Sequence, residues 1–118
     1  MAGFKLIEGM TDAPIAASDL STSLNRFVKL DSNGEAVLCG DNEKVYGSVF
    51  EAATLGAPVS VQLGGICKVV AGAAIAAGAR VACGTLGKAK TSTGTNPVGV
   101  ARQAATGDGS VISVAMIV

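Results

Sequence analysis

The sequence predicts a small all-β domain, a sandwich or barrel made of two similar halves with very little helix. Three features lead to this prediction: stretches that alternate with a period of two, turn signals spaced about 8 to 12 residues apart, and an internal repeat with an offset of 53 residues. A chain of 118 residues is long enough to bury a core of its own, so we expect a single domain.

The internal repeat is the strongest of these features. Its aligned segments are FVKLDSNGEA (27–36) with RVACGTLGKA (80–89), GSVFEAAT (47–54) with GVARQAAT (99–106), and Val59, Val61 and Leu63 with Ile112, Val114 and Met116. The repeat predicts halves of about 13–63 and 66–117, each with two strands around a glycine turn, a glycine-containing strand and an alternating strand. The match is weak upstream, where Leu20–Asn25 aligns with 73–78.

The junction of the halves, GGICKVVAGAAIAAGARVACG (64–84), is almost entirely small and apolar. A transmembrane helix needs about 20 apolar residues, and Lys68 and Arg80 leave a shorter uncharged run. Gly72 and Gly78 disfavour a soluble helix, because glycine inside a helix costs about 1 kcal/mol relative to alanine. No membrane contact is therefore expected.

Two strands are the better interpretation of this junction. The β-branched residues at its ends favour strands at Ile66–Ala71 and Arg80–Cys83, with a glycine-containing turn between them. Any helix is expected to be one short turn, near 73–77 or 18–24. The small side chains would allow neighbouring backbones to approach closely.

The N-terminal segment, residues 1–14, lies outside the repeat, and residues 15–118 form the single β domain. Two interpretations stay open for this segment: an extra edge strand of the domain, or an arm that docks on a neighbouring molecule. Its large apolar residues favour contact, since apolar surface left in water costs about 25 cal/mol per Å². Pro14 is a plausible boundary, because the residue before a proline favours extended geometry.

The composition argues against catalysis and against nucleic-acid binding. The chain has no histidine, and its net charge is zero with no basic stripe, so we expect neither an enzyme nor a nucleic-acid partner. Three cysteines, Cys39, Cys67 and Cys83, are expected to be reduced and structural, because an odd number at irregular spacings fits neither a disulfide framework nor a zinc site. No cofactor or metal is expected, and the N-terminus lacks the pattern of a secretory signal, which suggests a cytoplasmic origin.

Taken in order, the segments FVKLDSNGEAVLCG, VYGSVFEAATLGAPVSVQLGGICKVVAGAAIAAGARV and PVGVARQAATGDGSVISVAMI resemble the head decoration, or cement, proteins of tailed bacteriophages. The most specific pieces are Gly65-Ile66, Val70-Ala71-Gly72, Ala77-Gly78, Val98-Gly99-Val100-Ala101 and Ala104-Ala105. The resemblance covers the chain from about Ala16 onward. It implies a β-rich protein without catalytic residues, made in the bacterial host cytoplasm, that binds the outer surface of the assembled capsid.

The implied partners are the major capsid protein and further copies of the chain itself, with a homotrimer favoured and a dimer possible. The residues expected to contact the capsid or another subunit are Phe4, Leu6, Ile7, Met10, Gly64 and Gly65. The alternative function is another phage structural or adhesion module that binds a fibre, a receptor or a glycan. One tyrosine and no tryptophan count against a glycan site, since such sites usually present aromatic platforms.

Overall fold

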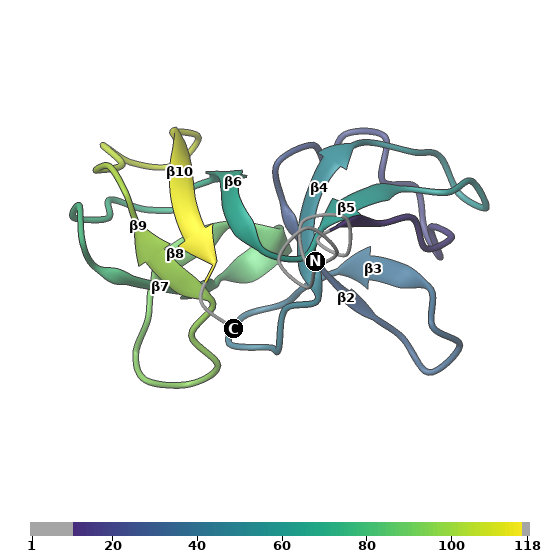
Figure 1. The fold of residues 1–118 in the computed structure, drawn as a ribbon, viewed down its shortest axis with the longest axis horizontal. Helices are drawn as coiled ribbons and strands as arrows, with labels where there is room; N and C mark the ends of the chain where they lie inside the picture. The colour runs from purple at the N-terminus through teal and green to yellow at the C-terminus, as the bar shows by residue number, and fades with distance from the viewer. Residues whose placement is uncertain (1–10, 117–118) are drawn as a thin grey trace, which may run out of the picture.

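The computed structural model describes residues 11–116 and confirms the all-β prediction. Two five-stranded antiparallel sheets make up a sandwich-like molecule, one sheet from each half of the chain (Figure 1). The strands of the N-terminal half are β1 (Thr11–Asp12), β2 (Phe27–Leu30), β3 (Ala36–Leu38), β4 (Gly47–Glu51) and β5 (Ser60–Gln62). Those of the C-terminal half are β6 (Gly65–Val70), β7 (Arg80–Cys83), β8 (Ala89–Thr91), β9 (Gly99–Ala101) and β10 (Val111–Met116).

The two sheets have the same strand order. It is β1-β5-β4-β2-β3 in the N-terminal half and β6-β10-β9-β7-β8 in the C-terminal half. Each strand from β2 to β5 therefore matches the strand that the sequence repeat aligns with it, and the remaining strand β1 matches β6. The predicted two-halved fold is confirmed by this topology, and the halves lie side by side (Figure 1).

The repeat extends into the segment where the two sequences match poorly. Asn25 and Gly78 both have positive φ angles, of 61° and 84°. Their backbone N–H groups donate to the carbonyls of Val49 and Ala101, each at 2.8 Å. A backbone conformation open to glycine and to asparagine is thus conserved between the halves although the side chains differ.

The predicted position of the helical turn is wrong. The one helical element in the described chain is a short 3₁₀ turn at Thr85–Gly87, between β7 and β8. The two expected positions are held in non-helical conformations by backbone hydrogen bonds to another loop. The N–H of Leu20 donates to Ala53 (2.9 Å), and that of Ile75 donates to Ala105 (3.1 Å).

Each half has a core of small and β-branched side chains. The N-terminal core consists of Ala16, Leu20, Val28, Ala36, Val49, Val59 and Val61. The larger C-terminal core consists of Cys67, Val69, Ala71, Ile75, Val81, Cys83, Ala89, Val98, Ala101, Ala105, Ile112 and Val114, together with Phe27 and Cys39. These last two come from the N-terminal half, so the second core is completed by the first half.

Close approach of neighbouring strands requires glycine at equivalent places in the two sheets. A Cβ on Gly47 of β4 would meet the carbonyl oxygen of Gln62 at 2.5 Å, and a Cβ on Gly99 of β9 would overlap the carbonyl group of Ala115. Both positions face the alternating strand that follows in sequence.

Candidate interaction surfaces

The contact between the halves covers the free edge of β6. The N–H of Val70 donates to the carbonyl of Asn25 at 2.7 Å. The Ser48 hydroxyl donates to the Lys68 carbonyl at 3.1 Å, and the Gln62 side-chain amide donates to the Ile66 carbonyl at 3.0 Å. Because an open strand edge can pair with another chain, these bonds remove a potential site of uncontrolled association.

The β3–β4 loop, residues 39–46, completes the contact between the halves. The N–H of Asn42 donates to the carbonyl of Cys83 at 2.8 Å, and the Asn42 carbonyl accepts from the Asn96 side-chain amide at 2.9 Å. Asp41 forms an ion pair with Lys90 at 2.7 Å. The loop therefore lies on the C-terminal half, held mainly by bonds to backbone groups.

All three cysteines are free and buried. Cys83 lies against Cys39, with its sulfur 3.5 Å from the Cys39 carbonyl oxygen. A hydrogen bond to the Cys39 side chain, and then burial, raise the pKa of Cys83. Burial raises the pKa of Cys67 to about 11. Raised pKa values keep both groups as neutral thiols, which is the state of structural rather than nucleophilic cysteines.

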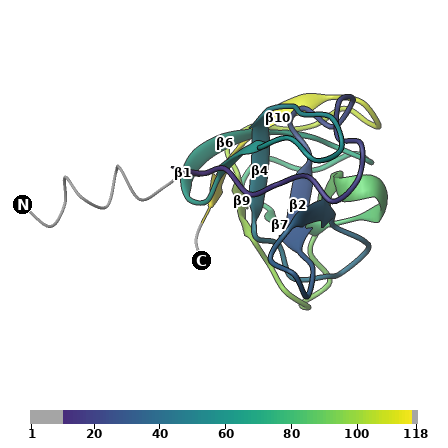
Figure 2. The same ribbon diagram turned by 90° about the vertical axis from the view of Figure 1, so that its right-hand side faces the viewer.

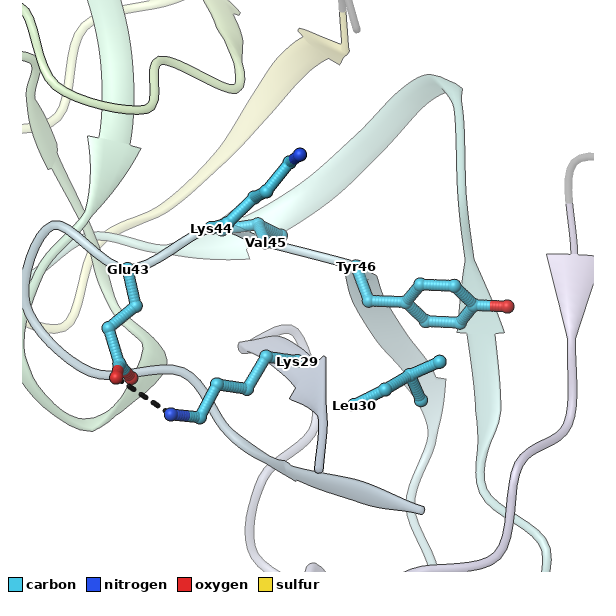
Figure 3. A pocket seen from close by; sticks show the side chains of 6 residues that line it. All are labelled: Lys29, Leu30, Glu43, Lys44, Val45 and Tyr46. Atoms are coloured by element: carbon cyan, nitrogen blue, oxygen red, sulfur yellow. Dashed lines mark hydrogen bonds and ion pairs between the residues drawn. The ribbon is translucent and has the colours of Figure 1, made fainter. Parts of the chain in front are cut away.

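An open pocket of about 450 Å³ lies in the N-terminal half (Figure 3). It is lined by Lys29, Leu30, Glu43, Lys44, Val45 and Tyr46. Lys29 and Glu43 form an ion pair of 2.7 Å at one side, and Leu30 and the Tyr46 ring lie at the other (Figure 3). The pocket therefore combines an apolar wall with a charged rim.

Three polar side chains of this pocket, Lys29, Glu43 and Tyr46, each have a hydrogen-bond partner. The hydrogen bond from Lys29 lowers the pKa of Glu43 and raises that of Lys29. The Tyr46 hydroxyl donates to the Asp12 carboxylate, and this bond raises the pKa of Tyr46. Structural ion pairs and hydrogen bonds also shift pKa values, so these shifts do not by themselves mark a catalytic site.

Of the residues predicted to contact the capsid, the structure describes Gly64 and Gly65. Gly64 lies between β5 and β6, and Gly65 is the first residue of β6; both are half-buried, and the Gly64 carbonyl accepts a 2.8 Å bond from the Gln62 side chain. Gly65 has a φ angle of 75° and lies opposite Met116. The other predicted contact residues, Phe4, Leu6, Ile7 and Met10, lie outside the described residues.

Strand β1 is the first described element and forms the edge of the N-terminal sheet. Thr11 pairs with Gln62, and Asp12 pairs with Val61. Pro14 follows at this edge, where its lack of an N–H is tolerated. Thr11, the first described residue, therefore lies opposite Gln62, two residues before Gly64.

Several large apolar side chains are exposed, and nothing in the sequence distinguishes most of them from core residues. They are Ile15, Leu24, Leu30, Phe50, Leu55, Ile66, Leu86 and Val111. Exposed apolar residues that occur singly are normal on a protein surface. Leu30 is the exception that matters, because it also lines the pocket.

Within residues 11–116 there is no group of three or more histidine, cysteine or acidic side chains placed to hold a metal ion. The acidic side chains serve local structure: the Asp31 carboxylate accepts from the N–H groups of Asn33 and Glu35 at 2.9 Å each. In the same part of the chain, no helix has the length and apolar character needed to cross a membrane.

The comparisons with known proteins agree with the sequence resemblance. The model of one family, described as phage cement protein, matches residues 11–116. No curated protein matches the chain. Among solved structures, the head fiber gp8.5 N base of bacteriophage phi29 has a similar fold, with a TM-score of 0.74 at 18% sequence identity over 91% of this chain and 92% of that one.

Proposed function

The chain belongs to the phage cement protein family, and we propose that it stabilises the phage head by binding the outer surface of the assembled capsid and bridging its subunits. Family membership makes it a structural component of the virion capsid and not an enzyme. The observation that carries the proposal is the family match across both halves, residues 11–116. A cement protein acts through many copies, so that individually modest contacts add up over the lattice.

A place on the outside of the head is supported by the solved relative. That protein is the base of a head fiber, and a fiber that projects from a head must be anchored at the outer surface. The two chains match over nearly their whole lengths, although the identity of 18% establishes only a common fold. We extend the position to this chain as part of the proposal.

We further propose that the chain binds as a homo-oligomer, with a trimer favoured, and that its N-terminal segment and Gly64–Gly65 contact the capsid or a neighbouring subunit. The register of β1 supports treating these parts as one contact region, since Thr11 lies opposite Gln62, two residues before Gly64. The segment adds four large apolar side chains, Phe4, Leu6, Ile7 and Met10, which gain most from burial.

The test is decoration of heads that lack the protein. A chain without residues 2–10, which keeps β1, should remain folded but bind heads weakly, and these heads should rupture at a lower temperature than fully decorated ones. A full-length chain with Phe4, Leu6, Ile7 and Met10 all changed to serine should behave in the same way. The matched control, Lys5→Ala with Glu8→Ala, keeps the apolar residues and should decorate normally.

Each outcome has a clear meaning. Full decoration and protection by the serine variant would move the contact away from the N-terminal segment. Failure of the natural chain to bind heads, combined with binding to bacterial glycans or receptors, would favour the alternative of an adhesion module. A soluble fluorescent fusion and sedimentation with purified heads separate these cases.

A further inference from the structure

The pocket in the N-terminal half has a counterpart in the C-terminal half, where the same place is filled. Leu30 in β2 corresponds to Cys83 in β7, and Leu30 is 36% exposed whereas Cys83 is fully buried. Tyr46 corresponds to Val98, because their N–H groups donate to the carbonyls of two residues that the repeat aligns. The Tyr46 N–H donates to Val28 (2.8 Å), and the Val98 N–H donates to Val81 (2.7 Å). Val98 is buried, and Tyr46 is only half-buried.

The group that fills the C-terminal counterpart is the β3–β4 loop of the same chain. Asn42 of this loop donates from its N–H to Cys83 and accepts from Asn96 with its carbonyl, and Cys39 lies against Cys83. Cys83 and Asn96 are the counterparts of Leu30 and Lys44, which line the open pocket. The pocket position of the C-terminal half is thus filled by the N-terminal half, whereas the pocket of the N-terminal half is open.

The repeat also identifies the segment that corresponds to the filling loop. It is the β8–β9 loop, residues 92–98, whose Asn96 also contacts the β3–β4 loop through its bond to Asn42. The two loops begin at Cys39 and Ser92 with equivalent backbone hydrogen bonds. The Cys39 N–H donates to the Phe27 carbonyl (3.1 Å), and the Ser92 N–H donates to the Arg80 carbonyl (2.8 Å). Residues 93–97 of the second loop are all exposed, and their small, uncharged side chains suit entry into a pocket of about 450 Å³.

We propose that the β8–β9 loop of a second copy of this chain enters the pocket formed by Lys29, Leu30 and Tyr46, so that contact between copies repeats the contact between halves. The free face of the N-terminal half, which is turned toward the viewer in Figure 2, would receive the C-terminal half of the neighbour. Such a contact joins two different surfaces, and repetition closes into a ring where the rotation permits. This inference rests on the homo-oligomer of the proposed function and supplies its interface.

Charge exchange at matching positions supports this arrangement. Phe27 packs in a core that includes Cys67, both within one chain. Arg80 is the counterpart of Phe27, because the cross-strand pair Arg80–Val100 repeats the pair Phe27–Ser48. Asp12 is the counterpart of Cys67, because the pair Asp12–Val61 repeats the pair Cys67–Val114. An apolar pair inside the chain is thus replaced by a cation and an anion, both exposed. A contact that forms only between copies would use opposite charges for steering and register.

Charge reversal in the full-length chain tests the proposal. Arg80→Glu and Asp12→Lys should each raise the dissociation constant of the homo-oligomer about tenfold or more, and the double variant should restore much of the loss. Sedimentation velocity over a concentration series measures the constant. A matched control is Arg102→Glu, which reverses another exposed arginine in the C-terminal half without a counterpart in the pocket.

Thiol cross-linking gives a second readout that does not depend on affinity. Cysteines placed at Leu30 and Thr95 should be joined between chains by a short bifunctional maleimide, whereas cysteines at Leu55 and Thr95 should not. Leu55 is exposed in the β4–β5 connection, outside the pocket lining. All three engineered positions are exposed, and the natural cysteines are buried, so the natural background is low.

The outcomes separate this inference from the proposed function. An oligomer that survives both single charge reversals, or that cross-links equally through Leu55, overturns the pocket contact and leaves the homo-oligomer intact. A chain that is monomeric in solution and also on heads overturns both. If both single variants lose self-association but still bind heads normally, the pocket contact is supported. Capsid binding is then separate from that contact.

Discussion

Phe27 of β2 and Arg80 of β7 occupy the same place in their respective sheets, yet Phe27 is fully buried and Arg80 is exposed. The backbone pairing around them is equivalent, since Phe27 lies opposite Ser48 and Arg80 opposite Val100. What differs is the neighbour: the C-terminal half covers Phe27, and no part of the described chain covers Arg80. The residue type at this position is therefore determined by whether another part of the chain covers the strand, and not by the position in the strand.

The same lesson holds at the sheet edges. Strand β6 pairs with β10 along six residues, and its outer edge is covered by the N-terminal half. Strand β1 pairs with β5 at two residues, and its edge carries Asp12 and Pro14. A charge and a proline are common devices on an edge that must not pair indiscriminately. The two halves therefore share a fold but differ in which of their surfaces is internal.

The largest expected effect comes from breaking the contact at its apolar centre. Phe27→Ala removes the largest fully buried side chain among residues 11–116, which links the N-terminal half to the C-terminal core. We expect the free energy of unfolding to fall by about 3 to 5 kcal/mol, as is typical for a buried phenylalanine. Urea unfolding followed by circular dichroism measures this loss.

The control for this prediction is Arg80→Ala, at the equivalent place in β7. A surface substitution of this kind should change the free energy of unfolding of the isolated chain by no more than about 0.5 kcal/mol. Losses of similar size in the two variants would show that the halves do not differ in the way that their burial indicates.

A pH dependence is the next largest effect, and it compares Cys67 with Asp12. Cys67 is buried and its pKa is raised from 9.0 to about 11, whereas Asp12 at the equivalent place is exposed. A raised pKa in the folded state stabilises the fold below pH 9, and this contribution is lost as the pH rises toward 11. The loss should be on the order of 2 to 3 kcal/mol.

Cys67→Ala should remove the Cys67 share of the alkaline loss, whatever its effect at neutral pH, and leave the share of Cys83, whose pKa is also raised. Unfolding free energies measured at intervals from pH 8 to pH 11 give the slope for each variant. Tyr46→Phe is a useful comparison, because the pKa of Tyr46 is also raised, by its bond to Asp12, but the side chain is only partly covered. An unchanged slope in Cys67→Ala would contradict the assigned cause.

Much of the fold could be predicted from the sequence because the signals were periodic. The offset of 53 residues aligned the strands correctly, since turn glycines such as Gly34 and Gly87 recur with positive φ in both halves. The prediction for the helical turn was wrong, since the described chain has it at Thr85–Gly87. Alanine-rich 73–77 has helix-forming residues, but its Ile75 is held by a pair of bonds to Ala105, a contact between distant segments that composition does not contain.

The pocket could not be predicted in the same way. Its residues come from β2 and from the β3–β4 loop, and Lys29 and Glu43 meet only because the loop folds back on the strand. A signal was present in the alignment, where Leu30 corresponds to Cys83 and Lys29 to Ala82, so that one half is small and the other large at the same places. This contrast indicates a pocket only once the burial of these side chains is known.

The smallest expected effect concerns the turns that follow β2 and β7. The first turn carries Asn33-Gly34, with a positive φ at Gly34, and an Asp31 side chain that caps the turn. The second carries Leu86-Gly87, and here both residues have positive φ, of 57° and 71°. Leucine in this region is strained because its Cβ approaches the backbone, and its side chain is 60% exposed, so little packing offsets the strain.

Leu86→Gly should therefore leave the free energy of unfolding unchanged or raise it by up to about 1 kcal/mol, because relief of strain outweighs the greater freedom of glycine in the unfolded chain. Leu55→Gly is the matched control: Leu55 is similarly exposed, at 66%, but is not among the residues with positive φ. That change should destabilise by about 0.5 to 1 kcal/mol through chain entropy alone. Thermal and urea unfolding of the two variants side by side measure the difference. Equal losses in both would mean that the C-terminal turn is no more strained than its N-terminal counterpart, and that the two halves differ only where they meet.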